Sequence, residues 1–256
     1  MSPLWPSTVY ASLFPGRRGL QLGRSAAPRW SEYAPSPAPL DLLAELIALL
    51  TEHTGQWRPG SRLVLTVSDS LAALAPLAWQ PALQTPAEVE AYAQACFEQQ
   101  GQPLDREWVQ HSDFRHHGRL GLAYALRRGC LTELPALCQA HGLRLRTVLP
   151  LSAAIYHRAA CAPGEGKRLL LLGDASRSTA LLYDHAGLIG YDVEPAAGDA
   201  QAATTRLLRR LAALHGAIEQ VAAWSAATDD ASSRAEQIVA NLPGAVVQAL
   251  TPSEWQ

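Results

Sequence analysis

Apolar and polar residues alternate weakly over residues 8–14, and a turn-forming segment, Pro15-Gly16-Arg17-Arg18-Gly19, follows them. This arrangement is typical of a β-hairpin, and the pattern adds a third strand at residues 29–33. Apolar residues then recur with helical spacing between residues 41 and 53, which predicts a helix with one broad buried face. The continuous apolar run at residues 62–67 predicts a buried strand.

The segment of about residues 70–130 reads as an insertion into this order of elements. Its clearest element is a helix at residues 86–99, because Thr85 and Glu88 form a capping-box pattern at its start. The remaining elements predicted before residue 160 are strands at residues 107–111, 120–126 and 143–149 and helices at residues 131–141 and 151–160.

The second half of the chain begins after a turn-rich boundary at residues 162–167. Beyond it the pattern predicts strand, strand, strand, helix, strand, helix, strand. The first half gives the same order once the insertion is set aside. Strands that alternate with helices at this spacing indicate a mixed α/β sheet covered by helices. The sequence therefore predicts an α/β protein of two similar lobes, each with the order βββαβαβ.

Composition narrows the class of protein. The chain has 256 residues, of which 48% are hydrophobic and 17% charged, and a formal net charge of -2, so we expect a folded core and no nucleic-acid partner. The four cysteines form no CxxC pair, which is typical of free thiols in a reducing cytoplasm. The longest apolar stretch, residues 40–50, is interrupted by acidic residues and is too short to cross a bilayer. We expect a cytoplasmic protein with no transmembrane segment of its own.

Three segments carry a resemblance to a known family: RLVLTVSDSLAALAPLAWQPALQTPAEVEAYAQACFEQQG, GLAYALRRGCLTELPALCQAHGLRLRTVLPLSAAI and LLLLGDASRSTALLYDHAGLIGYDVEP. They resemble the actin-like ATPase superfamily, and within it the cytoplasmic proteins of type IV pilus and type II secretion machinery, the PilM type and the cytoplasmic domain of the GspL type. The resemblance implies two ribonuclease-H-like lobes, at residues 1–160 and 166–256, with an inserted α+β subdomain at about residues 70–130. The second lobe is truncated relative to full-length actin-like ATPases.

Actin-like ATPases hold Mg-ATP between two hairpin loops of the form Asp-x-Gly followed by Ser or Thr, since carboxylates position the metal and glycine lets backbone N–H groups approach the phosphates. The first hairpin here has no carboxylate, and Pro15 removes a backbone donor. The turn expected to hold adenosine has Trp224 and no glycine. The second hairpin keeps four residues as a vestigial nucleotide site: Asp174, Ser176, Ser178 and Thr179. We expect Asp174 to bond nearby backbone N–H groups in a turn, and no cofactor.

The resemblance therefore implies a non-catalytic scaffold of a pilus or secretion assembly platform at the inner membrane. Its implied partners are the cytoplasmic tail of an inner-membrane assembly protein and the motor ATPase of the machine. Peptide capture in a groove leaves no sequence motif, so the candidate partner-binding residues are aromatic anchors: Trp79, Trp108 and Phe114. The alternatives are an active actin-like ATPase that binds Mg-ATP between the lobes, and an α/β interaction module unrelated to pili.

Three other patterns are weaker. Gly164-Glu165-Gly166-Lys167 lacks the spacing of a phosphate-binding P-loop and reads as a turn between lobes. The histidines of residues 111–117 suggest zinc, but two arginines accompany them and a solvated loop is the simpler interpretation. Ser68-Asp69-Ser70 could belong to a hydrolase, but no Gly-x-Ser-x-Gly motif is present.

Overall fold

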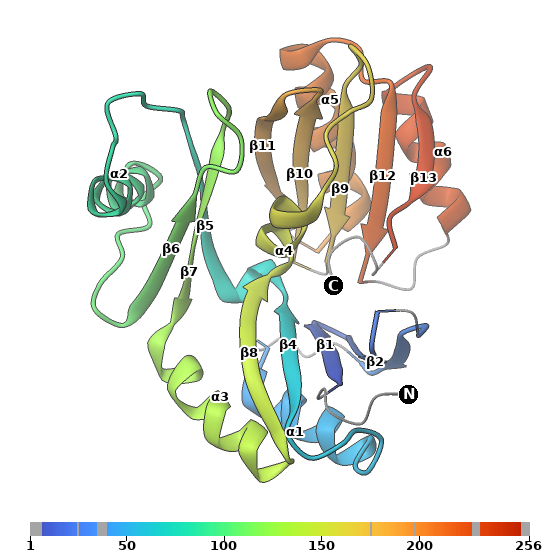
Figure 1. Cartoon of the computed structure of the whole chain (residues 1–256). Coiled ribbons are helices and arrows are strands. Elements are labelled where there is room, and N and C mark those ends of the chain that lie inside the picture. The colour runs from blue at the N-terminus through green and yellow to red at the C-terminus, as the bar shows by residue number, and fades with distance from the viewer. Residues whose placement is uncertain are drawn as a thin grey trace.

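The computed structural model describes residues 7–24, 26–34, 40–174, 176–196, 198–226 and 231–251. Its elements form two five-stranded sheets and one three-stranded sheet (Figure 1). Mixed α/β architecture is therefore confirmed, and the predicted order of elements is found in both halves of the chain.

The first sheet has the strand order β3-β2-β1-β4-β8. Strands β1, β2 and β3 are antiparallel neighbours, whereas β4 is parallel to β1 and β8 is parallel to β4. Helices α1 and α3 pack against this sheet and against each other. The bounds are β1 Thr8–Phe14, β2 Arg17–Leu22, β3 Arg29–Glu32, α1 Leu42–Glu52, β4 Ser61–Val67, α3 Arg128–Ala140 and β8 Leu143–Pro150.

The second sheet repeats this topology in the order β11-β10-β9-β12-β13. Here β9, β10 and β11 are antiparallel neighbours, and β12 and β13 continue in parallel. Buried leucines of α5 pack on this sheet in a core of its own. The bounds are β9 Arg168–Gly173, β10 Arg177–Asp184, β11 Gly187–Pro195, α5 Ala200–His215, β12 Gln220–Ser225, α6 Ala231–Asn241 and β13 Val246–Ala249.

The insertion forms the three-stranded sheet, in the order β5-β7-β6, with helix α2 on one face (Figure 1). Helix α2 has the predicted capping box, in which Thr85 and Glu88 satisfy each other's backbone N–H groups. Strand β5 was not predicted, because its sequence AALAPL is poor in β-branched residues and contains Pro76; it lies at a sheet edge, where proline is tolerated. The bounds are β5 Ala72–Leu77, α2 Pro86–Gln99, β6 Trp108–Asp113 and β7 Gly121–Arg127.

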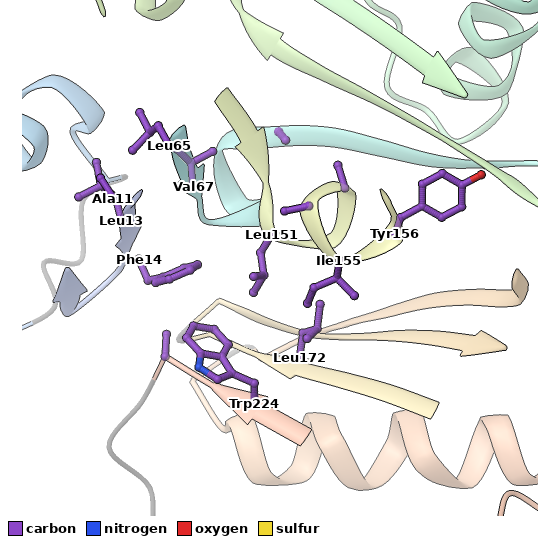
Figure 2. Close-up of a cluster of buried hydrophobic side chains, with 14 of the residues drawn as sticks. Ala11, Leu13, Phe14, Leu65, Val67, Leu151, Ile155, Tyr156, Leu172 and Trp224 are labelled. Carbon is purple, nitrogen blue, oxygen red and sulfur yellow. The ribbon is translucent and has the colours of Figure 1, made fainter. Parts of the chain in front are cut away.

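Helix α4, Leu151–Arg158, lies between the two five-stranded sheets (Figure 1). Its first six residues are buried. Leu151 and Ile155 belong to one hydrophobic cluster that includes residues of both sheets, among them Leu65 and Leu172 (Figure 2). A single apolar core therefore joins the two halves of the chain, and burial of its side chains favours their packing together.

Candidate functional site

The turn between β9 and β10, the second hairpin, is organised by Asp174. Its Oδ1 accepts hydrogen bonds from the backbone N–H groups of Ser176 at 2.8 Å and Arg177 at 3.0 Å, and from the Ser176 hydroxyl at 2.6 Å. These are the turn contacts that the sequence predicted for this carboxylate. Oδ1 of Asp174 therefore accepts three hydrogen bonds from residues of its own turn.

The other oxygen of Asp174 reaches the first sheet. The Ser68 hydroxyl, just beyond the end of β4, donates to Asp174 Oδ2 at 2.7 Å, and only 8% of Asp174 is exposed. Both oxygens therefore accept protein hydrogen bonds. A carboxylate bound in this way is a structural link between the sheets, and it must give up a buried contact to turn toward a hydrated metal ion.

A second buried carboxylate, Asp69, lies beside this link. Its two oxygens accept from the Ser152 N–H at 2.9 Å and from the Ser152 hydroxyl at 2.5 Å, at the start of α4. Burial raises the pKa of Asp69 to about 6; the Ser152 hydrogen bonds oppose this rise, and the nearby charge of Asp174 adds to it. Sequence patterns indicate Asp69 only as part of a hydrolase-like Ser68-Asp69-Ser70 segment, because its partner Ser152 is remote along the chain.

The first hairpin, β1 and β2, meets the second sheet through aromatic rings. The Phe14 and Trp224 ring centroids are 4.7 Å apart, and Trp30 lies 6.3 Å from Phe14 and 6.4 Å from Trp224. Phe14 is fully buried and Trp224 is 8% exposed. Figure 2 shows the Phe14 and Trp224 rings next to each other between the two sheets, and the planes of the rings are inclined by 55°. Aromatic packing therefore fills space between the end of β1 and the end of β12.

A cavity of about 550 Å³ adjoins the second hairpin on the side of α5 and α6. Of the four predicted nucleotide residues, Asp174 and Ser178 line it, whereas Thr179 is buried outside the lining and Ser176 is exposed in the turn. The Ser178 and Thr204 hydroxyls are 2.8 Å apart. Trp224 and Ser225, from the turn expected to hold adenosine, also line the cavity. The sequence pattern did not indicate the other polar residues of the lining: Asp199, Gln201, Thr204, Ser233, Arg234 and Gln237.

Comparison with known proteins gives a fold but no close relative. No family model and no curated protein matches this sequence. A Bacteroides thetaiotaomicron protein with an actin-like ATPase fold and unknown function is similar over 95% of this chain and 91% of its own, with a TM-score of 0.63 and 8% identity. The chain has the actin-like ATPase fold.

Two further structures with the actin-like fold come from assembly machines. A chain of the PilM–PilN type IV pilus biogenesis complex is similar over 94% of this chain and 90% of its own, with a TM-score of 0.64 and 15% identity. The cytoplasmic domain of EpsL, an inner-membrane component of the Vibrio cholerae type II secretion system, covers 98% of this chain and 87% of its own, with a TM-score of 0.50 and 12% identity. The predicted resemblance to these proteins is thus supported at the level of fold.

The inserted subdomain of this actin-like chain carries the three predicted aromatic anchors. Trp79 and Phe114 come together edge to face, with ring centroids 5.2 Å apart, beside a groove at α2. Trp108 is elsewhere: it packs against the core under α2, and the Arg127 guanidinium lies 4.1 Å from its ring centroid. All three side chains are half-buried. The structure therefore places two of the three predicted anchors in one groove and the third outside it.

A different groove, which the sequence did not indicate, lies between the insertion and the first sheet. It has a volume of about 580 Å³ and runs along residues 143–148 of β8, with α3 and the strands β6 and β7 as its other walls. We call it the β8 groove. Helix α2 covers one face of the inserted sheet, and the opposite face, with Val109, Tyr124 and Leu126, opens into this groove.

Two other expectations concern metals and membranes. Among the described residues, no group of three or more His, Cys, Asp or Glu side chains is placed to hold a metal ion. His116 and His117 point to different neighbours: His116 packs against Gly187, and His117 against Trp79. No helix in the described ranges is both long enough and apolar enough to span a membrane.

Proposed function

We propose that this chain is a non-catalytic actin-like scaffold in the inner-membrane assembly platform of a type IV pilus or type II secretion system. It acts in the cytoplasm and binds the short cytoplasmic tail of a membrane-anchored assembly protein, and the motor ATPase is a second partner. Its fold supports the proposal, because the similar structures include a chain of a PilM–PilN complex and the cytoplasmic domain of EpsL.

The observation that carries the non-catalytic role is the packing between the two hairpins. Phe14 at the end of the first hairpin lies against Trp224, and Asp174 of the second hairpin is held by Ser68. An actin-like ATPase needs this space for phosphates and a hydrated metal ion. Here it contains aromatic rings and a carboxylate whose oxygens already have partners, so phosphates and a metal ion would have to displace these contacts.

The β8 groove is the proposed tail-binding site. Strand β8 is the last strand of the first sheet, so one of its edges has no partner strand within the described ranges. Consecutive residues of β8 line the groove, which therefore runs along this edge. An extended peptide can add to such an edge by backbone hydrogen bonds while its side chains enter apolar pockets. The apolar side chains that line the groove and would contact those of the peptide are Val109, Tyr124, Leu126, Leu131, Leu143, Leu145 and Val148.

The charged residues of the β8 groove indicate which peptides it can bind. Arg144 and Arg146 line the groove, and no Asp or Glu is among its lining residues. A tail that alternates apolar residues with an acidic residue complements such a surface, since opposite charges improve association and select against a basic partner.

A site-specific crosslink tests this proposal. A photoreactive phenylalanine analogue replaces Val109, which is 37% exposed in the β8 groove, and the protein is irradiated in its own cells. We expect one adduct, and mass spectrometry should place the crosslinked residue within a short cytoplasmic tail of a membrane protein of the assembly machine. Leu145→Asp should abolish the adduct by placing a charge in the apolar wall.

The matched control is the same analogue at Val246, which is 67% exposed on the edge strand β13, far from the β8 groove. Equal labelling from both positions, or an adduct with a protein that has no membrane anchor, would contradict the proposed role of the groove.

The second candidate function is an active actin-like ATPase with Mg-ATP as cofactor. The cavity beside the second hairpin favours it, because Asp174 and Ser178 line that cavity and its volume of about 550 Å³ is within the range of ligand sites. In that function Asp174 would hold the hydrated metal ion, and Ser176, Ser178 and Thr179 would donate to phosphates. The buried position of Thr179 and the bond from Ser68 to Asp174 weigh against it.

A further inference from the structure

A second groove of the insertion differs from the β8 groove in the sign of its charge. It lies between the start of α2, the segment of residues 79–85 and the end of β6, and its volume is about 560 Å³. We call it the Trp79 groove. Strand β6 forms a wall of both grooves, since Val109 lines only the β8 groove while Gln110 and His111 line both.

The Trp79 groove has an aromatic end and an aliphatic side. The Trp79 ring meets Phe114 edge to face and lies 4.7 Å from the His117 ring centroid, which holds the indole in place. Leu83 and Val89 are half-buried on the aliphatic side. Half-buried aromatic and aliphatic side chains around a concave surface are the anchors on which peptide contacts depend.

Carboxylates surround this apolar surface. Glu90 and Asp113 line the groove, and the side chain of Asp113 is 44% exposed. Nδ1 of His157 lies 3.7 Å from Asp113 Oδ2, but burial lowers the pKa of His157 and favours its neutral form. The Glu88 carboxylate lies at the rim, where it accepts from the N–H groups of Gln84 and Thr85 at 2.9 Å. These bonds lower the pKa of Glu88, so it is ionised at neutral pH. The negative charge of Glu88, in the first turn of α2, offsets the positive end of the helix, which would otherwise favour an anion.

Positive charge is nearly absent from the lining. It contains no Lys or Arg, and His111 is its sole basic member. Arg115 follows Phe114 in the chain but turns away, because its guanidinium donates to the carbonyl oxygens of Tyr156 at 2.7 Å and Ala159 at 2.6 Å. The groove is therefore apolar at its base and negative at its rim.

We propose that the Trp79 groove binds a basic linear segment of a partner protein, in which Lys or Arg residues alternate with apolar ones. The cations pair with Glu90 and Asp113 and approach the face of the Trp79 indole, and an apolar side chain enters between Leu83 and Val89. The opposite charge of the β8 groove prevents the same segment from binding there. This inference stands independently of the role proposed for the β8 groove.

The test uses the purified full chain and two short fluorescent peptides, one of alternating lysine and leucine and one with glutamate in place of lysine. Fluorescence anisotropy should show saturable binding of the lysine peptide. The double variant Glu90→Gln/Asp113→Asn keeps the shape of both side chains and should weaken that binding about fivefold at low salt. Trp79→Ala should weaken it by about tenfold or more.

The matched control is Glu133→Gln/Glu165→Gln, which removes two exposed carboxylates that line neither groove and should leave the affinity for the lysine peptide unchanged. Circular dichroism and thermal unfolding identify any variant that fails to fold. If Trp79→Ala does not fold, the charge variant Glu90→Gln/Asp113→Asn still tests the proposal. The proposal is overturned if the lysine peptide does not bind, or binds parent and charge variant equally. It is also overturned if Trp79→Ala dissociates a dimer of this chain or releases it from anionic vesicles, which would assign the groove to a second copy or to a membrane.

Discussion

The Ser68 hydroxyl donates a 2.7 Å hydrogen bond to Asp174 Oδ2, joining the end of a strand in the first sheet to the turn between β9 and β10 in the second. Ser68 is fully buried and Asp174 nearly so. Buried polar links of this kind hold two elements in one geometry, because breaking them leaves a charged oxygen without a donor.

Ser68→Ala should lower the free energy of unfolding by about 1–3 kcal/mol, because it leaves Asp174 Oδ2 buried without this donor. The matched control is Ser176→Ala, which removes a hydroxyl from the same carboxylate at an exposed position. Water can replace that hydroxyl, so the control should change stability by no more than about 0.5 kcal/mol. Urea denaturation measures both, and equal losses would contradict a buried link.

Asp69 makes the stability of the protein depend on pH. Its pKa is about 6 in the folded chain, whereas an unfolded aspartate titrates near about 4. Between these values the folded protein binds more protons than the unfolded chain, so the contribution of Asp69 to stability falls as pH rises through this window. Asp69→Asn stays neutral and should gain about 2 kcal/mol relative to the parent between about pH 4 and pH 7.

Urea unfolding of parent and variant across this window provides the measurement. Since other groups titrate in both proteins, the difference between the two curves is the quantity to follow. Gln94→Asn, which exchanges one neutral amide for another at an exposed position, is the control and should leave that difference flat. A flat difference for Asp69→Asn as well would show that Asp69 is ionised throughout the window.

Local signals in the sequence predicted the elements well. The helix at residues 86–99 was found with its bounds, because Thr85, Pro86 and Glu88 determine its start within a few residues. The role of Asp174 in its turn was also predictable, because its partners there, Ser176 and Arg177, are only two and three residues away. Strand β5 was not predicted, because its small side chains form no strand pattern. Its partner strand β7 is about 50 residues away in the sequence.

The contacts that decide function are long-range, and the sequence could not show them. The resemblance places Trp224 in the turn expected to hold adenosine, but its packing against Phe14 depends on how the sheets meet. The β8 groove arises where the insertion leaves one face of its sheet uncovered beside a strand edge. The aromatic anchors are a further example. Sequence alone does not distinguish the roles of Trp79, Trp108 and Phe114, whereas the fold places Trp108 outside the groove that contains the other two.

Mg-ATP at millimolar concentration should leave the thermal unfolding of the parent unchanged, because Phe14 packs against Trp224 and Ser68 holds Asp174. A ligand at a hundred times its Kd would add about 2.7 kcal/mol of stability, a shift of a few degrees for a chain of this size. A magnesium-dependent shift that disappears in Asp174→Asn would instead support the ATPase. Magnesium alone and ATP alone serve as controls.

Gly187→Ala should loosen the insertion from the second sheet. Gly187 has φ of 144°, and a Cβ atom there would lie 2.8 Å from Cβ of His116, in the loop between β6 and β7. That loop is also held by Arg119, whose guanidinium lies 2.7 Å from Asp184, and by the N–H of Leu120, which donates to Leu188 at 3.0 Å. The variant should lose about 1–3 kcal/mol of stability from backbone strain and the displaced imidazole.

The variant Gly118→Ala distinguishes the effect of backbone strain from that of displacing the His116 imidazole. Gly118 lies in the same loop with φ of 71°, and a Cβ atom there would meet nothing within 4 Å, so this variant carries backbone strain alone. Hydrogen exchange of residues 114–120 should accelerate in Gly187→Ala and stay near the parent rate in Gly118→Ala, because only the first displaces His116. Equal acceleration in both variants would mean that the packing of His116 on Gly187 does not hold the insertion against the second sheet.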